Sequence, residues 1–149
     1  MQWWGVTLKG VEWGNAWAQH SPKIPHTNWI VGDHPAIPSE SLRFVRHGGP
    51  SEEGERLEKL ALKWFAHHPD DPPAWGAAKP MSCGRTFSLL AGIGAFELTF
   101  CRGEERLILL LESPGDFAVW GPGIAHSWRV LKPSLMMTLR WELVGEDDG

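Results

Sequence analysis

The chain has 149 residues, a formal net charge of −4 and 42% hydrophobic residues. This is enough apolar material for the core of one domain, and it excludes a disordered chain. The weak negative charge argues against a nucleic-acid-binding surface, and no apolar run reaches the roughly 18–20 residues that cross a bilayer.

The N-terminal segment and the number of cysteines indicate the cellular location of the protein. The N-terminal segment lacks the basic and apolar regions of a signal peptide. Cys83 and Cys101 are too few for a disulfide framework. We therefore expect a single domain over residues 1–149 of a cytoplasmic protein, with neither a membrane nor a nucleic-acid partner.

Residues 1–59 are rich in Gly, Pro, Trp and His and show no sustained period. Two short pieces, 28–31 and 42–46, are apolar enough to be strands, and Pro35 and Pro38 separate them. We expect this part of the chain to form strands and loops that pack on a barrel built from residues 60–143.

Residues 57–66 fit two kinds of secondary structure. Leu57, Leu60 and Trp64 have the spacing of one helical face, whereas Leu60, Leu62 and Trp64 alternate as in a strand. The proline-rich segment 68–73 ends either element. The sequence leaves the choice between helix and strand open.

The second half of the chain reads as a series of short strands. Phe96, Leu98 and Phe100 alternate with Glu97 and Thr99, as expected for a strand with one buried face. Residues 101–105 have the composition of a hairpin turn. Closely spaced strands with alternating residues predict an all-β barrel or sandwich. The expected strands are 86–90, 95–100, 106–111, 117–120, 127–131 and 135–143.

Residues 113–128 carry a recognisable motif. A Pro-Gly-Asp turn at Asp116 precedes a short strand, a Gly-Pro-Gly turn follows, and His126 enters the returning strand. This arrangement resembles the second conserved motif of the cupin superfamily (RmlC-like proteins), and Gly92 matches the glycine that closes the first. The resemblance implies a single-domain double-stranded β-helix, a jelly-roll barrel with little helix, in which His126 points inward.

The first cupin motif lacks its usual metal ligands. Counting back from Gly92 places Arg85 at the position of the family's glutamate. The His-x-His pair would fall near 78–81, where the chain reads Ala-Ala-Lys-Pro-Met over 77–81. A single histidine does not hold Zn²⁺ or Fe²⁺, which take three or four ligands. We therefore expect neither a metal nor another cofactor.

A narrower likeness comes from several short segments. Lys63-Trp64, residues 86–90, the Gly-Pro-Gly turn at 121–123, residues 126–128 and Arg140-Trp141 are similar to a small cupin family of unknown function. Some members of that family carry the label "signal peptidase I". The chain shows no membrane anchor and no serine–lysine dyad, so we do not expect that activity here.

The leading functional hypothesis is a barrel that binds a small polar or anionic ligand. Guanidinium groups suit the binding of carboxylates and phosphates, and tryptophans suit a pocket wall. Alternatively, His126 is only a packing residue, and the charged residues lie on the surface. Whether the protein is an enzyme stays open. The candidate ligand-binding residues are His126, Arg85, Trp128, Trp120, Lys63 and Arg140.

Two other functions remain possible from the sequence. One is a metal-dependent enzyme with a non-standard site that combines His126 with His67 or His68. The other is a structural or partner-binding barrel. The resemblance to cupins and the many early tryptophans also favour a homodimer, because exposed apolar patches commonly mark interfaces. These tryptophans are Trp3, Trp4, Trp13 and Trp17.

Overall fold

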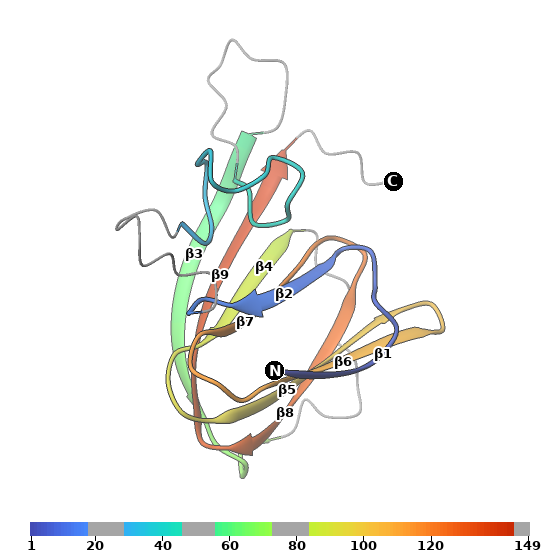
Figure 1. Cartoon of the computed structure of the whole chain (residues 1–149), viewed down its shortest axis with the longest axis vertical. Coiled ribbons are helices and arrows are strands. Elements are labelled where there is room, and N and C mark those ends of the chain that lie inside the picture. The colour runs from blue at the N-terminus through green and yellow to red at the C-terminus, as the bar shows by residue number, and fades with distance from the viewer. Residues whose placement is uncertain (18–28, 46–55, 73–83, 145–149) are drawn as a thin grey trace.

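The computed structural model describes residues 1–17, 29–45, 56–72 and 84–144, and within these ranges the secondary structure consists of β-strands (Figure 1). None of the described residues belongs to a helix long and apolar enough to cross a membrane.

The strands form two antiparallel sheets. Sheet A has the order β1-β6-β5-β8, and sheet B has the order β2-β7-β4-β9-β3. The strands of sheet A are β1 (Gln2–Gly5), β5 (Ala95–Arg102), β6 (Glu105–Leu111) and β8 (Ala125–Lys132). The strands of sheet B are β2 (Val11–Asn15), β3 (Arg56–His67), β4 (Arg85–Leu90), β7 (Asp116–Trp120) and β9 (Ser134–Val144).

The path of the chain between the sheets defines the fold. Apart from the β5–β6 hairpin, each step from β4 to β9 crosses from one sheet to the other. This is the winding of a jelly roll, in which two sheets enclose one interior. The predicted all-β double-stranded β-helix is confirmed, and so are the strands expected after residue 85. The two N-terminal strands extend the sheets, since β1 pairs with β6 and β2 with β7.

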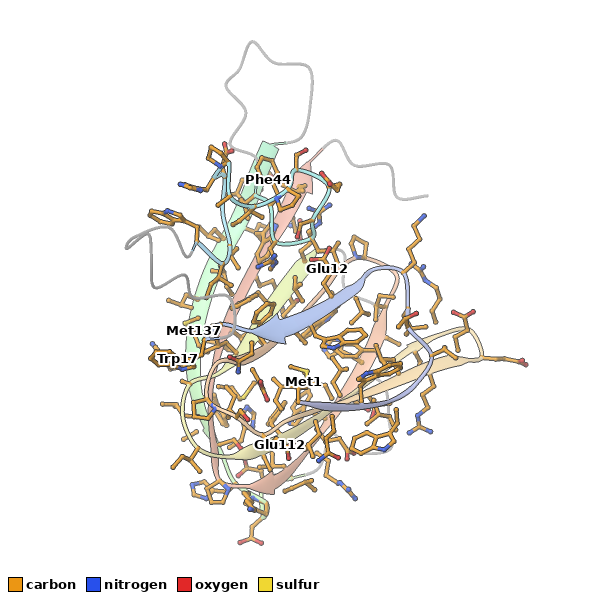
Figure 2. The ribbon with its side chains drawn as sticks, in the orientation of Figure 1. Met1, Glu12, Trp17, Phe44, Glu112 and Met137 are labelled. Atoms are coloured by element: carbon orange, nitrogen blue, oxygen red, sulfur yellow. The ribbon has the colours of Figure 1, made fainter. Side chains whose placement is uncertain are left out.

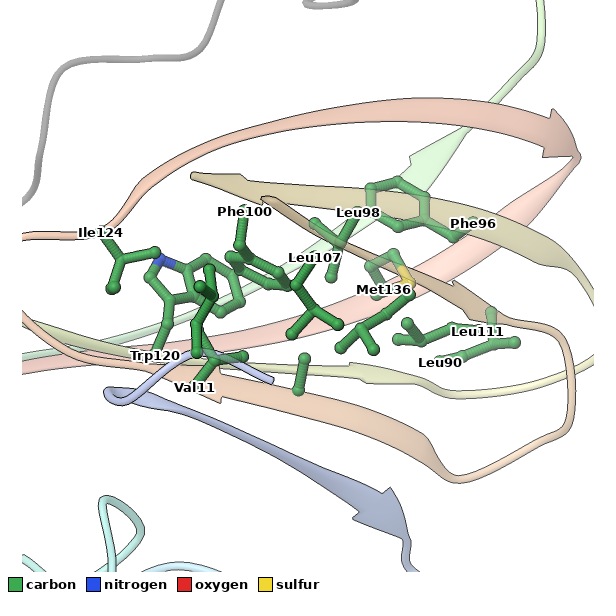
Figure 3. Close-up of a cluster of buried hydrophobic side chains, with 13 residues drawn as sticks. Val11, Leu90, Phe96, Leu98, Phe100, Leu107, Leu111, Trp120, Ile124 and Met136 are labelled. Carbon is green, nitrogen blue, oxygen red and sulfur yellow. The ribbon is translucent and has the colours of Figure 1, made fainter. Parts of the chain in front are cut away.

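The barrel interior is filled by apolar side chains from both sheets (Figure 3). Phe96, Leu98 and Phe100 of β5 face this interior, as their alternation predicted. Leu107, Leu109 and Leu111 of β6 lie beside them and are fully buried. The four-stranded and five-stranded sheets are therefore held together by a continuous hydrophobic cluster.

A second hydrophobic cluster covers the outer face of sheet B. Phe87, Val119 and Trp141 point away from the barrel interior, and the segment 29–45 packs over them through residues such as Leu42 and Val45. The strands β4 and β7 of sheet B are thus buried on both faces, which explains why they are almost wholly buried.

The covering segment 29–45 does not contain the two expected strands. Within the described parts of 28–31 and 42–46 the backbone forms bends and turns instead. Its turns close through local bonds such as Ser41 N to Pro38 O and Phe44 N to Ser41 O. Glu12 of β2 anchors the segment by accepting hydrogen bonds from Leu42 N at 3.0 Å and Ser41 Oγ at 2.8 Å. Figure 2 shows Glu12 on β2 and Phe44 on this segment.

Residues 56–67 form a strand, which resolves the choice that the sequence left open. Among the described strands, β3 lies at the edge of sheet B and pairs with β9 alone. A bulge between Glu58 and Ala61, where Lys59 has φ of 54°, shifts the register. Leu60, Leu62 and Trp64 stay exposed, and this explains why their pattern was ambiguous.

Ser134 ties two neighbouring turns together. Its Oγ donates to Lys132 O at 2.7 Å and accepts from Ala95 N at 3.1 Å, so it joins the β8–β9 turn to the start of β5. Gly94 leaves room for this hydroxyl, because a Cβ at Gly94 would lie 2.5 Å from it. Gly92, in the same turn, has open space around it.

We predict that Gly94→Ala destabilises the fold by about 1–3 kcal/mol, because the new methyl group displaces the Ser134 hydroxyl from its buried position. Gly92→Ala is the matched control and should change the free energy of unfolding by less than about 0.5 kcal/mol. Denaturant unfolding of the two variants measures both. Equal effects would show that the Ser134 contact does not constrain the turn.

Candidate functional site

A cavity of about 70 Å³ lies between the two sheets, inside the barrel. Both sheets contribute inward-facing side chains to its wall. From sheet A these are Phe96, Leu98, His126 and Trp128. From sheet B they are Lys63, His67, Thr86, Ser88, Trp120, Met136, Thr138 and Arg140.

Strand alternation decides which residues reach the cavity. On β4, Thr86 and Ser88 face inward, while Arg85 and Phe87 face the covering segment on the outside. On β9, Thr138 and Arg140 face inward, and Leu139 and Trp141 face outward. The side chains of a pleated strand point alternately to the two faces, so neighbouring residues belong to different environments.

His126 is buried in the wall formed by sheet A. Its ring lies 5.0 Å from the ring of Trp120, centroid to centroid, across the barrel interior. The same Trp120 ring lies 5.1 Å from Phe100. His126 therefore points inward, as the cupin resemblance implied, and stands among aromatic rings.

His67 reaches the same cavity from the last position of β3. Its ring centroid lies 5.0 Å from that of Phe96 and 6.2 Å from that of Trp128. Its Nδ1 is 3.7 Å from a carboxylate oxygen of Asp71. Burial lowers the pKa of His67 below its ordinary value, Asp71 opposes this shift, and Lys63 adds to it. The imidazole is therefore held mainly in its neutral form near pH 7.

Two residues of the cavity wall each carry a buried hydrogen-bond donor with no hydrogen-bond partner among the described residues. The donors are Thr86 Oγ1 and Trp120 Nε1, on side chains that are 1% and 3% exposed. Buried polar groups are almost always satisfied by protein, water or ligand. The nearby Ser88 and Thr138 hydroxyls differ in this respect, since they bond each other at 2.9 Å.

The charged groups of the cavity wall are all cationic. Lys63 and Arg140 are exposed and stand where the cavity meets solvent. Among the described lining residues there is no aspartate or glutamate. The nearest carboxylate that the structure places beside a lining residue is that of Asp71, 3.7 Å from His67 Nδ1.

The structure brings together five of the six residues expected to bind a ligand: His126, Trp128, Trp120, Lys63 and Arg140. That they bind one stays a prediction.

The expectation that Arg85 shares a cavity with His126 is wrong. Arg85 precedes the inward-facing Thr86 and therefore points to the opposite face of β4, where its Nη1 donates to Phe44 O at 3.4 Å. The prediction for Arg85 came from counting residues back from Gly92. Such counting gives a position along the chain, but it does not determine to which face of the strand the side chain points.

Sequence reasoning did not single out the hydroxyl residues Thr86, Ser88 and Thr138. A usable signal was present, since Thr138 alternates in phase with the expected pocket residue Arg140. On β4 the inward face could not be predicted, because the strand is buried on both faces and its inward face carries the polar residues Thr86 and Ser88.

Of the two adjacent histidines, only His67 lines the cavity. The His68 side chain is exposed, and its backbone N–H donates to Asp71 Oδ2 at 2.9 Å in the turn that follows β3. Nowhere in the described ranges do three or more His, Cys, Asp or Glu side chains gather as metal ligands would. The positions 78–81, considered for the His-x-His pair, and Cys83 lie outside the described residues.

Comparison with known proteins found few likenesses. No protein-family model matches the chain, and no curated protein matches it. A solved structure of Streptomyces albus HEPD, with its substrate 2-hydroxyethylphosphonate and Fe(II) bound, matches with a TM-score of 0.49 and 20% sequence identity. The match covers 68% of this chain and 24% of that one, so this chain spans about a quarter of the HEPD chain.

The depressed pKa of His67 predicts a loss of stability in mild acid. The unfolded chain takes up a proton near pH 6.5, whereas the folded chain does so only at lower pH. The unfolded state therefore binds more protons as the pH falls below 6.5, and the free energy of unfolding decreases. We expect His67→Gln to reduce this decrease between pH 7.5 and pH 5, as measured by denaturant unfolding.

His68→Gln is the control for this measurement, because it removes an exposed imidazole next to the same strand end. It should leave the pH dependence of the wild type in place. If both variants behave alike, burial of His67 in the cavity wall has no effect on proton binding.

Proposed function

We propose that the protein binds a small anionic molecule in the barrel cavity. One observation carries this proposal: two buried donors, Thr86 Oγ1 and Trp120 Nε1, share a cavity with the cations Lys63 and Arg140. An anion that accepts hydrogen bonds from the donors would also neutralise the charge at the mouth.

The physical setting favours such a ligand. Charge-assisted hydrogen bonds are stronger than neutral ones, and they strengthen where water is excluded. Thr86 and Trp120 are buried, so an anion that reached them would leave most of its hydration shell. Arg140 can hold a carboxylate or phosphate with two parallel N–H donors. The binding energy would come from these contacts together.

The cavity sets a limit on the size of the ligand. Its volume of about 70 Å³ is small beside the roughly 300–1,000 Å³ of most ligand pockets. Because the wall is open to solvent at Lys63 and Arg140, part of a ligand could extend outward. These dimensions favour a metabolite with few heavy atoms over a nucleotide or a polymer.

We expect acetate and inorganic phosphate, used as simple probes, to bind the wild-type protein with a measurable affinity by calorimetry. Arg140→Gln should raise the dissociation constant about tenfold, since losing a charged hydrogen-bond partner costs about 1.5 kcal/mol or more. Lys63→Gln should weaken binding in the same direction, by less, because a lysine makes single contacts.

Arg106→Gln is the matched control, because this exposed arginine of β6 does not line the cavity. It removes the same charge and should leave the affinity unchanged. Equal losses in the Arg106 and Arg140 variants would reveal only a general charge effect. Absence of binding by both probes up to about 50 mM, a concentration far above usual metabolite affinities, would favour a structural or partner-binding barrel.

A second candidate function, a metal-dependent enzyme, is favoured by the presence of His67 and His126 in one cavity. Two imidazoles are fewer than the three or four protein ligands of a typical site. We therefore predict that the purified protein carries no stoichiometric transition metal. Elemental analysis finding about one Zn, Fe, Mn or Ni per chain, lost in His67→Ala and His126→Ala, would contradict this and establish a metal site at the two histidines.

The homodimer and the cytoplasmic location stay predictions. In support of a dimer, Trp3, Trp4 and Trp17 are 47%, 46% and 71% exposed, which is unusual for such large apolar side chains. Trp13 is only half-buried and lies 5.7 Å from Trp3, ring to ring. The Trp3 and Trp13 rings are in contact, and we propose that two copies pair through the apolar surface around them.

A further inference from the structure

We infer that the anionic ligand is a flat ring acid, that is, an aromatic or heteroaromatic carboxylate. The inference rests on the proposed anion-binding function and adds to it the chemistry of the ligand body. It follows from the unequal composition of the two cavity walls.

Sheet B supplies the polar wall in two successive rows across its strands. The first row places Trp120, Thr86 and Arg140 side by side, because Thr86 pairs with both of the others. The second row places Ser88, Thr138 and Lys63 side by side, because Thr138 pairs with Ser88 on one side and Lys63 on the other. Each of these six side chains carries a hydrogen-bond donor. Apolar residues complete the rows, with Val11 and Ala61 in the first and Ala118 in the second.

The first row is the place for the acid group. It holds two cavity-wall donors that lack a partner among the described residues, Thr86 Oγ1 and Trp120 Nε1, next to the Arg140 guanidinium. A carboxylate has two oxygens with about four acceptor positions, which matches these three neighbouring donors. In the second row, Ser88 and Thr138 already bond each other and offer less.

The next row along sheet B is apolar, since it contains Leu90, Met136 and Phe65. The polar wall therefore ends about two residues from the acid position. Beyond that point a ligand would meet Met136 from sheet B and Phe96 from sheet A, both of which line the cavity. The part of the ligand that lies against Met136 and Phe96, away from the acid group, should therefore have no polar atoms.

Rings dominate the rest of the wall. His67, Phe96 and Trp128 form one group, with the His67 ring in contact with the other two. His126 and Trp120 form another, with 5.0 Å between their centroids. Aromatic side chains prefer offset-stacked or edge-to-face neighbours, and such pairs gain energy beyond simple burial. A planar ring therefore gains more here than an aliphatic body of equal size.

The experiment compares three probes of similar size by calorimetry. Benzoate has a flat ring and a charge, cyclohexanecarboxylate has the charge without the flat ring, and benzyl alcohol has the ring without the charge. We expect benzoate to bind about fivefold more tightly than cyclohexanecarboxylate, and benzyl alcohol to bind at least tenfold more weakly than benzoate. Benzoate should also shift the indole N–H resonance of Trp120, assigned with Trp120→Phe.

Two variants separate the two walls. Trp128→Leu keeps an apolar side chain but removes a ring, so the preference for benzoate over cyclohexanecarboxylate should fall to about twofold or less. Trp29→Leu is the matched control, because Trp29 is exposed and lies outside this cavity. Thr86→Val keeps the shape of the side chain, and it should weaken both acids severalfold without changing their ratio.

The outcomes distinguish failure of this inference from failure of the proposed function. Equal binding of the two acids would overturn the ring class and leave the anion site standing. Equal binding of benzoate and benzyl alcohol would overturn the role of the acid group. If none of the acids binds, and acetate and phosphate also fail, the anion site itself is wrong.

Discussion

The burial of the central strands of sheet B on both faces is the constraint on which the rest of the structure depends. Inward-facing residues of β4 and β9 line the barrel, and outward-facing residues support the covering segment 29–45. Most positions on β4 belong to one of the two clusters or to the cavity wall, whereas β9 also carries the exposed residues Leu135 and Arg140. A one-residue shift of β4 would therefore exchange Thr86 with Phe87 and place a phenyl ring where the cavity has its buried hydroxyl.

The turn before β7 fixes this register at one end. Asp116 is buried and accepts hydrogen bonds from Glu112 N and Ser113 N at 3.0 and 2.9 Å. Its other oxygen accepts from Asn15 Nδ2 at 2.8 Å, which joins the turn to β2. Gly115, with φ of 87°, supplies the left-handed conformation that the turn requires. The Pro-Gly-Asp motif therefore acts on the site indirectly, because it places Trp120 at the end of a fixed strand.

The sequence was most informative where one face of a strand differs from the other. The alternation of Phe96, Leu98 and Phe100 with polar residues predicted both the strand and its buried face. Residues 42–46 misled, because apolar residues that anchor a covering loop look like those of a short strand. Arg85 misled for another reason: its position was inferred by counting, while its direction depends on pairing with β7 and β9. The clustering of Lys63 with Arg140 depends likewise on long-range pairing between β3 and β9.

Because β3 lies at the edge of sheet B, the sides of the cavity differ in stiffness. Lys63 and His67 belong to a strand that is bonded on one side only, whereas Thr86 and Trp120 belong to strands held between two neighbours. Edge strands open locally at lower free energy than central strands, so amide hydrogen exchange should be faster in β3 than in β4. Ligands of different width would therefore be accommodated by movement of the Lys63 side. The wall that holds Thr86 would keep its shape and so would select for the group that touches it.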